Sequence, residues 1–163
     1  MQVFYFLLSF AEYCNMIKTF KYNLFLDDIR MPKDVIRNAN ALHLTPELIE
    51  HYKGVWVIVR NYNDFVEYIT EHGLPEIISF DHDLADEHYR ESMYDPDIEH
   101  YSKYYSDGTF KEKTGYNCAK WLIEYCLDNK EYLPVCLIHT QNPVGRLNIL
   151  SLITSYNKIK NES

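Results

Sequence analysis

The sequence predicts one α/β domain, built as a three-layer sandwich around a mainly parallel sheet of four to five strands. Short apolar runs alternate with helical segments along the 163 residues. Such alternation implies parallel strands joined by right-handed crossovers, with helices on both faces. The run at residues 77–80 is mostly apolar and leads directly into Asp81-His82-Asp83. It is typical of a strand buried on both faces, and ligands of open parallel sheets bind beyond such strand ends.

Four strands and four helices are expected in order along the chain. The strands are predicted at residues 22–26, 55–59, 77–80 and 133–138. The helices are predicted to begin near Thr45-Pro46, near residue 63, at Thr114 and at Asn142-Pro143. Capping residues, first-turn prolines and apolar 3.6-residue periodicity support these positions. Residues 31–44 show no clear periodicity, so no element is predicted there.

The net charge and the cysteine content indicate which ligands and which cellular compartment to expect. The formal net charge is −8, from 24 acidic and 16 basic residues, which argues against broad binding to duplex DNA. A small anionic ligand remains compatible, because a few arginines or a metal can reverse the field locally. Cys14, Cys118, Cys126 and Cys136 form no CxxC pair. We therefore expect reduced thiols and a cytoplasmic protein.

Three segments lie outside the regular pattern. Residues 1–21 form an N-terminal extension whose apolar stretch is too short to span a bilayer and lacks the basic region of a signal peptide. It is either an extra element on the core or a segment that precedes a true start at Met16. Residues 85–113 are polar and tyrosine-rich, which favours a lid that stacks on a base. The domain would span 22–157, and 158–163 would be a polar tail.

Polar residues follow every predicted strand. The first strand is followed by Asp27, Asp28 and Arg30, and the second by Arg60. The third strand ends in Asp81-His82-Asp83. The fourth is followed by His139-Thr140-Gln141-Asn142, and then by Arg146 in the last helix. Because parallel strands end at one edge of a sheet, these residues are expected to form one site.

The residue types indicate phosphate chemistry, with alternatives left open. Asp27, Asp28 and Asp81 offer oxygen ligands to Mg²⁺ or another divalent cation, or an aspartate caps a turn. His82 and His139 suit acid–base catalysis near neutral pH. The three arginines either clamp a phosphate or pair with nearby aspartates. The helix starts at Thr114 and Asn142 favour an anion, and Gly145 would allow its close approach.

One pattern of residues resembles the receiver domains of two-component signalling. Asp27, Asp28, Asp81 and Thr140 match the acidic pair, the third-strand aspartate and the threonine of that family. A receiver also carries a lysine after a fifth strand, which is not seen here, and does not normally place a histidine at the position of His82.

A closer resemblance is to the cyclic-phosphate-processing receiver-like family. The motifs that carry it are Leu26-Asp27-Asp28-Ile29-Arg30-Met31-Pro32, Val59-Arg60, Asp81-His82-Asp83-Leu84, Thr114-Gly115-Tyr116 with Trp121, and His139-Thr140-Gln141-Asn142-Pro143-Val144-Gly145-Arg146. The resemblance covers about residues 22 to 156. It implies a receiver-like, or flavodoxin-like, fold and action on cyclic phosphates of nucleotides or RNA ends.

With this resemblance, the sequence predicts a cyclic phosphodiesterase acting on a nucleotide, an ADP-ribose derivative or an RNA end, as in nucleotide processing or RNA repair. The expected catalytic residues are His82, His139, Asp81 and Asp83. The expected substrate-binding residues are Arg30, Arg60, Thr114, Thr140, Asn142 and Arg146. Asp27, Asp28 and Asp81 would hold the metal in a competing version. The rival functions are a phosphoacceptor module with Asp81 as acceptor, and a non-catalytic binder of cyclic nucleotides.

Overall fold

The computed structural model describes residues 21–84 and 113–162, with side chains described through residue 160. The expectations for the N-terminal extension and for the lid therefore lie outside the described residues, apart from their last residues Lys21 and Lys113.

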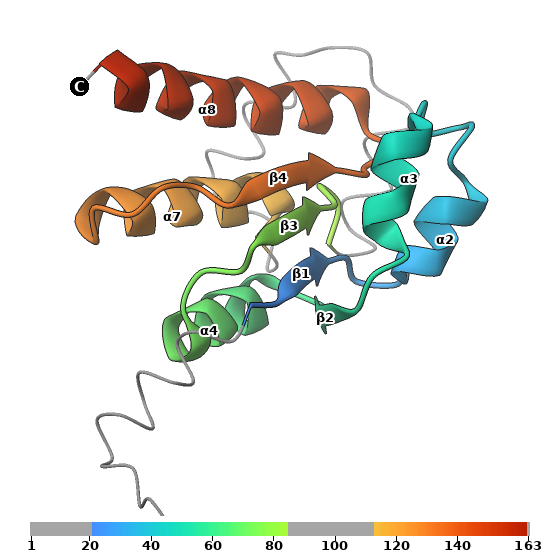
Figure 1. Cartoon of the computed structure of the whole chain (residues 1–163), viewed down its shortest axis with the longest axis horizontal. Helices are drawn as coiled ribbons and strands as arrows, with labels where there is room; N and C mark the ends of the chain where they lie inside the picture. Colours follow the sequence, from blue (N-terminus) through green and yellow to red (C-terminus); the bar gives the residue numbers. More distant parts are fainter. Residues whose placement is uncertain (1–20, 85–112, 163) are drawn as a thin grey trace, which may run out of the picture.

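The centre of the fold is a four-stranded parallel sheet in the order β2-β1-β3-β4. The strands are β1 (Asn23–Leu26), β2 (Trp56–Val59), β3 (Ile77–Phe80) and β4 (Val135–Ile138), and Figure 1 shows their arrows pointing the same way. This confirms the predicted α/β fold. Strand β3 has the expected bounds, and β1, β2 and β4 begin one or two residues later than expected.

The register makes all four strands end at one level. Leu26 is paired with both Val59 and Phe80, and Phe80 is paired with Ile138. Backbone hydrogen bonds continue one residue further, from Asp81 N to Leu26 O and from His139 N to Phe80 O, both 2.9 Å. The residues that follow the strands therefore leave the sheet side by side.

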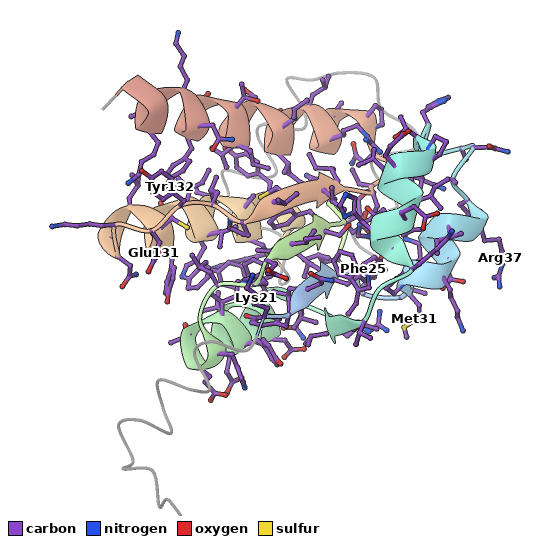
Figure 2. All side chains as sticks on the ribbon, in the orientation of Figure 1. Lys21, Phe25, Met31, Arg37, Glu131 and Tyr132 are labelled. Atoms are coloured by element: carbon purple, nitrogen blue, oxygen red, sulfur yellow. The ribbon has the colours of Figure 1, made fainter. Side chains whose placement is uncertain are left out.

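Helices cover both faces of the sheet. The helices of the described residues are α2 (Pro32–Arg37), α3 (Pro46–Tyr52), α4 (Tyr62–His72), α7 (Gly115–Asp128) and α8 (Pro143–Glu162). Leu24, Leu26, Ile78 and Phe80 pack with α4, α7 and α8 in the larger core, and Figure 1 shows α7 and α8 running side by side. On the other face, Phe25 and Leu137 pack with α2 and α3. Phe25, labelled in Figure 2, has its ring 6.4 Å from that of Tyr52 on α3.

Two helical segments differ from the expectation. Helix α2 occupies part of the stretch for which no element was predicted. It is six residues long, buries Val35 alone, and so shows no apolar period; Pro32 at its start and the bond from Met31 N to Asp34 Oδ2, 3.0 Å, stabilise it. Helix α8 continues to Glu162, so residues 158–162 of the predicted polar tail are helical, because no glycine or proline stops the helix.

Candidate functional site

Three buried side chains meet where β1, β3 and β4 end. Asp27, Asp81 and His139 are 0%, 1% and 0% exposed. One ligand atom from each lies within 4.8 Å of the other two. The register of the strands produces this cluster, since each residue directly follows its strand.

Asp27 is the most heavily hydrogen-bonded member. Its Oδ1 accepts the backbone N–H of Ile29, at 2.9 Å, and of Arg30. Its Oδ2 accepts Arg30 Nε at 2.7 Å and His139 Nε2 at 3.0 Å. Burial alone would raise the pKa of Asp27, but the bond from His139 and the charge of Arg30 outweigh it and lower that pKa. Asp27 is therefore an ionised acceptor at neutral pH.

Arg30 bridges the two carboxylates of the cluster. Its Nη2 lies 2.6 Å from Asp81 Oδ2, its Nε bonds Asp27, and its Nη1 lies 3.5 Å from the carbonyl oxygen of His139. The side chain is 21% exposed. Of the two interpretations given for this arginine, phosphate clamp or partner of a nearby aspartate, the structure shows the second.

His139 belongs to a chain of buried hydrogen bonds on the face of the sheet that packs with α2 and α3. Its Nδ1 lies 2.7 Å from Ser79 Oγ, and Ser79 Oγ lies 2.8 Å from the hydroxyl of Tyr52. Burial raises the pKa of Tyr52 to about 12, so the phenol keeps its proton. Burial lowers the pKa of His139 despite the opposing effect of Asp27. The consistent polarity is Tyr52 to Ser79 to His139 Nδ1, with His139 Nε2–H donating to Asp27.

Sequence reasoning missed Ser79 and Tyr52. Ser79 is the one polar residue of the apolar run at 77–80, and a fully buried hydroxyl requires a partner. That signal was available. No such signal points to Tyr52, because its contact with Ser79 depends on how α3 packs on the sheet.

A second cluster surrounds His82 and Asp83. His82 Nδ1 lies 2.8 Å from Asp83 Oδ1. Asn142 Nδ2 donates to the same oxygen at 3.2 Å and lies 3.5 Å from His82 Nδ1. The other end of the Asn142 amide, Oδ1, accepts the Gly145 N–H at 2.9 Å and so caps α8. The start of α8 and the His82–Asp83 pair are therefore joined by one side chain.

Two glycines let the helices α7 and α8 approach this segment closely. A Cβ at Gly145 would lie 2.2 Å from Cγ of His82, and one at Gly115 would lie 1.8 Å from the carbonyl oxygen of Asp81. Gly115 also donates its N–H to the oxygen of His82 at 2.8 Å. Gly145, expected to admit a phosphate, thus admits the His82 ring.

We predict that Gly145→Ala displaces the His82 imidazole while leaving the fold in place. The added methyl would lie 2.2 Å from Cγ and 2.7 Å from Cβ of His82. Rotation of the side chain moves Cγ but not Cβ, so the start of α8 must also shift. The destabilisation should be about 1–2 kcal/mol. Imidazole ¹⁵N NMR should show the loss of the bond between His82 Nδ1 and Asp83, and unchanged His82 resonances would contradict the prediction.

The remaining predicted substrate residues take part in local structure. Arg60 Nη1 donates to the carbonyl oxygens of Asp27 and Arg30, both at 2.8 Å, and its Nη2 lies 3.1 Å from the sulfur of Met31. Arg60 thus holds the loop after β1. Arg146 makes one side-chain hydrogen bond within the described residues, from Nη2 to Thr140 O at 3.1 Å. Within the described part of the chain its other donors make no hydrogen bond, so they could bind a ligand.

Both predicted threonines serve as local acceptors or donors at helix starts. Thr140 Oγ1 accepts the Asn142 N–H at 3.2 Å. Thr114 is 1% exposed, and its hydroxyl donates to Asn117 Oδ1 at 3.1 Å in the first turn of α7. Each stabilises a chain segment beside His82.

A metal ion would find its donors in Asp27, Asp81 and His139 rather than in three aspartates. Among the described residues, these three form the group whose donor atoms lie close enough together to hold one metal ion, and Asp28 is not part of it. Two carboxylates and an imidazole suit transition metals better than Mg²⁺. The donor spacing fits one ion, but Arg30 lies between the carboxylates, and the Nε2 proton of His139 points at Asp27.

Comparisons with known proteins agree with these motifs. Within the described residues no helix is both long and apolar enough to cross a membrane. No curated protein and no solved structure matches the chain significantly. The family model described as the cyclic-phosphate processing receiver domain matches residues 22–155, which includes the strands, the Asp81-His82-Asp83 segment and the first turns of α7 and α8. The chain therefore belongs to the cyclic-phosphate processing receiver domain family.

Proposed function

We propose that this domain hydrolyses a cyclic phosphodiester of a nucleotide, an ADP-ribose derivative or an RNA end, with His82 transferring the proton. The observation that carries the proposal is the His82–Asp83 pair, with 2.8 Å between Nδ1 and Oδ1. A carboxylate on Nδ1 fixes the ring in one orientation, and in the proposed reaction the other nitrogen, Nε2, exchanges the proton with the substrate.

In the proposed complex the phosphate binds at the start of α8, beside His82. Gly145 lies against the His82 ring, and the next residue, Arg146, carries a guanidinium held at one nitrogen by Thr140 O. An anion bound by Arg146 also benefits from the positive end of the α8 dipole. His82 and the phosphorus atom are thereby brought to the same helix terminus.

The reaction is hydrolysis of one ring P–O bond. His82 removes a proton from a water molecule as the water oxygen bonds to phosphorus, and one ester bond of the ring breaks. The proton then passes to the leaving oxygen, which becomes a hydroxyl, and the product is a phosphomonoester. Positive charge from Arg146 stabilises the charge that develops on the phosphoryl oxygens.

His139 has a different role in this scheme. Both of its ring nitrogens bond protein groups, Nδ1 to Ser79 and Nε2 to Asp27. It holds Asp27 in place rather than touching the substrate.

The test is a screen of 2′,3′-cyclic, 3′,5′-cyclic and ADP-ribose cyclic phosphates with wild type and His82→Gln. General acid–base catalysis is typically worth 10²–10⁴-fold, so we expect His82→Gln to lower kcat by about that factor. His51→Gln, at an exposed position on α3, is the matched control. Equal turnover by wild type and His82→Gln would sink the proposal.

The same samples address the rival functions. A stable acyl phosphate on Asp81 after incubation with acetyl phosphate and Mg²⁺ would favour a signalling receiver. Tight binding of a cyclic nucleotide without turnover would favour a non-catalytic binder.

A further inference from the structure

The guanidinium of Arg30 lies where a cation shared by two strand-end carboxylates would lie. Its Nε is 2.7 Å from Asp27 Oδ2 and its Nη2 is 2.6 Å from Asp81 Oδ2. Both carboxylates are essentially inaccessible, at 0% and 1% exposure. Buried carboxylates require a partner of opposite charge, because leaving either one unpaired is strongly destabilising.

The main chain fixes this arginine at its base. The Arg30 N–H bonds Asp27 Oδ1, and Arg60 Nη1 donates at 2.8 Å to the carbonyl oxygens of Arg30 and Asp27. Helix α2 begins at Pro32, two residues later. The loop therefore delivers the guanidinium to the carboxylates in a preset geometry, which reduces the conformational entropy lost in forming the two ion pairs.

The hydrogen-bond polarity around His139 agrees with a guanidinium. Ionised Asp27 can only accept, so the His139 nitrogen 3.0 Å away carries the proton. The lone pair is then on Nδ1, which faces Ser79. A metal bound with Asp27 and Asp81 would need the lone pair on Nε2 and would reverse the chain from Ser79 to Tyr52.

We propose that Arg30 takes the place of a divalent metal ion at this sheet edge, and that removing its guanidinium turns Asp27, Asp81 and His139 into a metal site. In the native chain the positive charge between the two carboxylates is then part of the protein itself, whereas a metal ion would have to be bound from solution. The binding arm of the test is independent of turnover, so this proposal and the proposed function can fail separately.

The decisive measurement is Mn²⁺ binding, followed by the EPR signal of free Mn²⁺, in wild type, Arg30→Met and Arg37→Met. Methionine keeps much of the side-chain volume and removes the charge. Arg37 is the matched control, since it is an exposed arginine of α2 paired with Asp34. We expect Arg30→Met to bind one Mn²⁺ per chain at least tenfold more tightly than wild type and Arg37→Met. Adding Asp81→Asn to Arg30→Met should abolish that binding.

Either of two binding results would overturn the proposal. The first is wild type binding one Mn²⁺ per chain as tightly as Arg30→Met. The second is folded Arg30→Met binding no Mn²⁺ more tightly than the control. Co²⁺ absorption adds a ligand-specific readout: the bands of Co²⁺-loaded Arg30→Met should change when His139→Gln is added, and unchanged bands would remove His139 from the site.

A stability measurement covers the case in which Arg30→Met folds poorly. Removing one carboxylate together with the guanidinium rebalances the buried charge, so Arg30→Met/Asp81→Asn should have a higher thermal midpoint than Arg30→Met alone. Mn²⁺ should raise the midpoint of Arg30→Met and leave that of wild type unchanged. A double variant no more stable than Arg30→Met would contradict the charge substitution.

Discussion

Gly115→Ala is expected to destabilise the domain by about 3 kcal/mol, the upper end of the usual cost of overpacking. The new Cβ would lie 1.8 Å from the carbonyl oxygen of Asp81 and 3.1 Å from Cα of His82. These are backbone atoms of the segment that ends β3, and they cannot rotate away. Helix α7 would have to move off the sheet, which would also break the bond from Gly115 N to His82 O.

Urea unfolding of Gly115→Ala beside Gly54→Ala measures this effect. A Cβ at Gly54 would meet its nearest atom, His51 O, at 3.5 Å, an ordinary contact. The free energy of unfolding of Gly54→Ala should therefore stay close to that of wild type. Equal values for the two variants would show that α7 is less tightly docked than the structure indicates.

Asp27→Asn is the second change with a large expected effect, also about 3 kcal/mol. The asparagine amide has nearly the shape of the carboxylate, so the loss of stability measures the effect of removing the charge. Arg30 would face Asp81 alone, and the pairing with Arg30 and His139 that lowers the pKa of Asp27 would be removed. An Asp128→Asn variant, at the exposed end of α7, is the control.

The effect of Asp27→Asn should depend on pH with a definite sign. The folded-state pKa of Asp27 is lower than its unfolded value, which is about 3.9. Its carboxylate therefore stabilises the fold fully above that unfolded pKa, and the contribution is lost as pH falls through the folded pKa. The stability difference between wild type and Asp27→Asn, from urea unfolding, should be constant from pH 5 to 7 and shrink at lower pH. A difference that grows on acidification would contradict the assignment.

The strand ends could be predicted because the sequence encodes them locally. The apolar runs before Asp27, Asp81 and His139 identify buried parallel strands, and parallel strands align their ends. The close approach of Asp27, Asp81 and His139 follows from this alignment of the strand ends. Helix α2 escaped prediction for the opposite reason: six residues with one buried side chain give no period.

The partners of the charged residues could not be predicted. Arg30 and Arg60 are compatible with a phosphate clamp or an internal ion pair, and residue type does not distinguish them. The choice depends on the path of the loop after β1, where Arg60 bonds the carbonyl oxygens of Asp27 and Arg30. Likewise, the distinct surroundings of His82 and His139 come from α8 and α3, which pack from distant parts of the chain.

The hydrogen-bond chain that ends at Tyr52 has an optical consequence. The ring of Tyr52 stacks on the indole of Trp56, with 5.7 Å between centroids and 18° between planes. The second tryptophan of the sequence, Trp121, lies on α7 and packs on Phe65 against the other face of the sheet. With Trp121 replaced by phenylalanine, the remaining indole fluorophore is two contacts from His139. The domain thus carries an intrinsic fluorescent probe of its buried strand-end charges, and needs no attached dye.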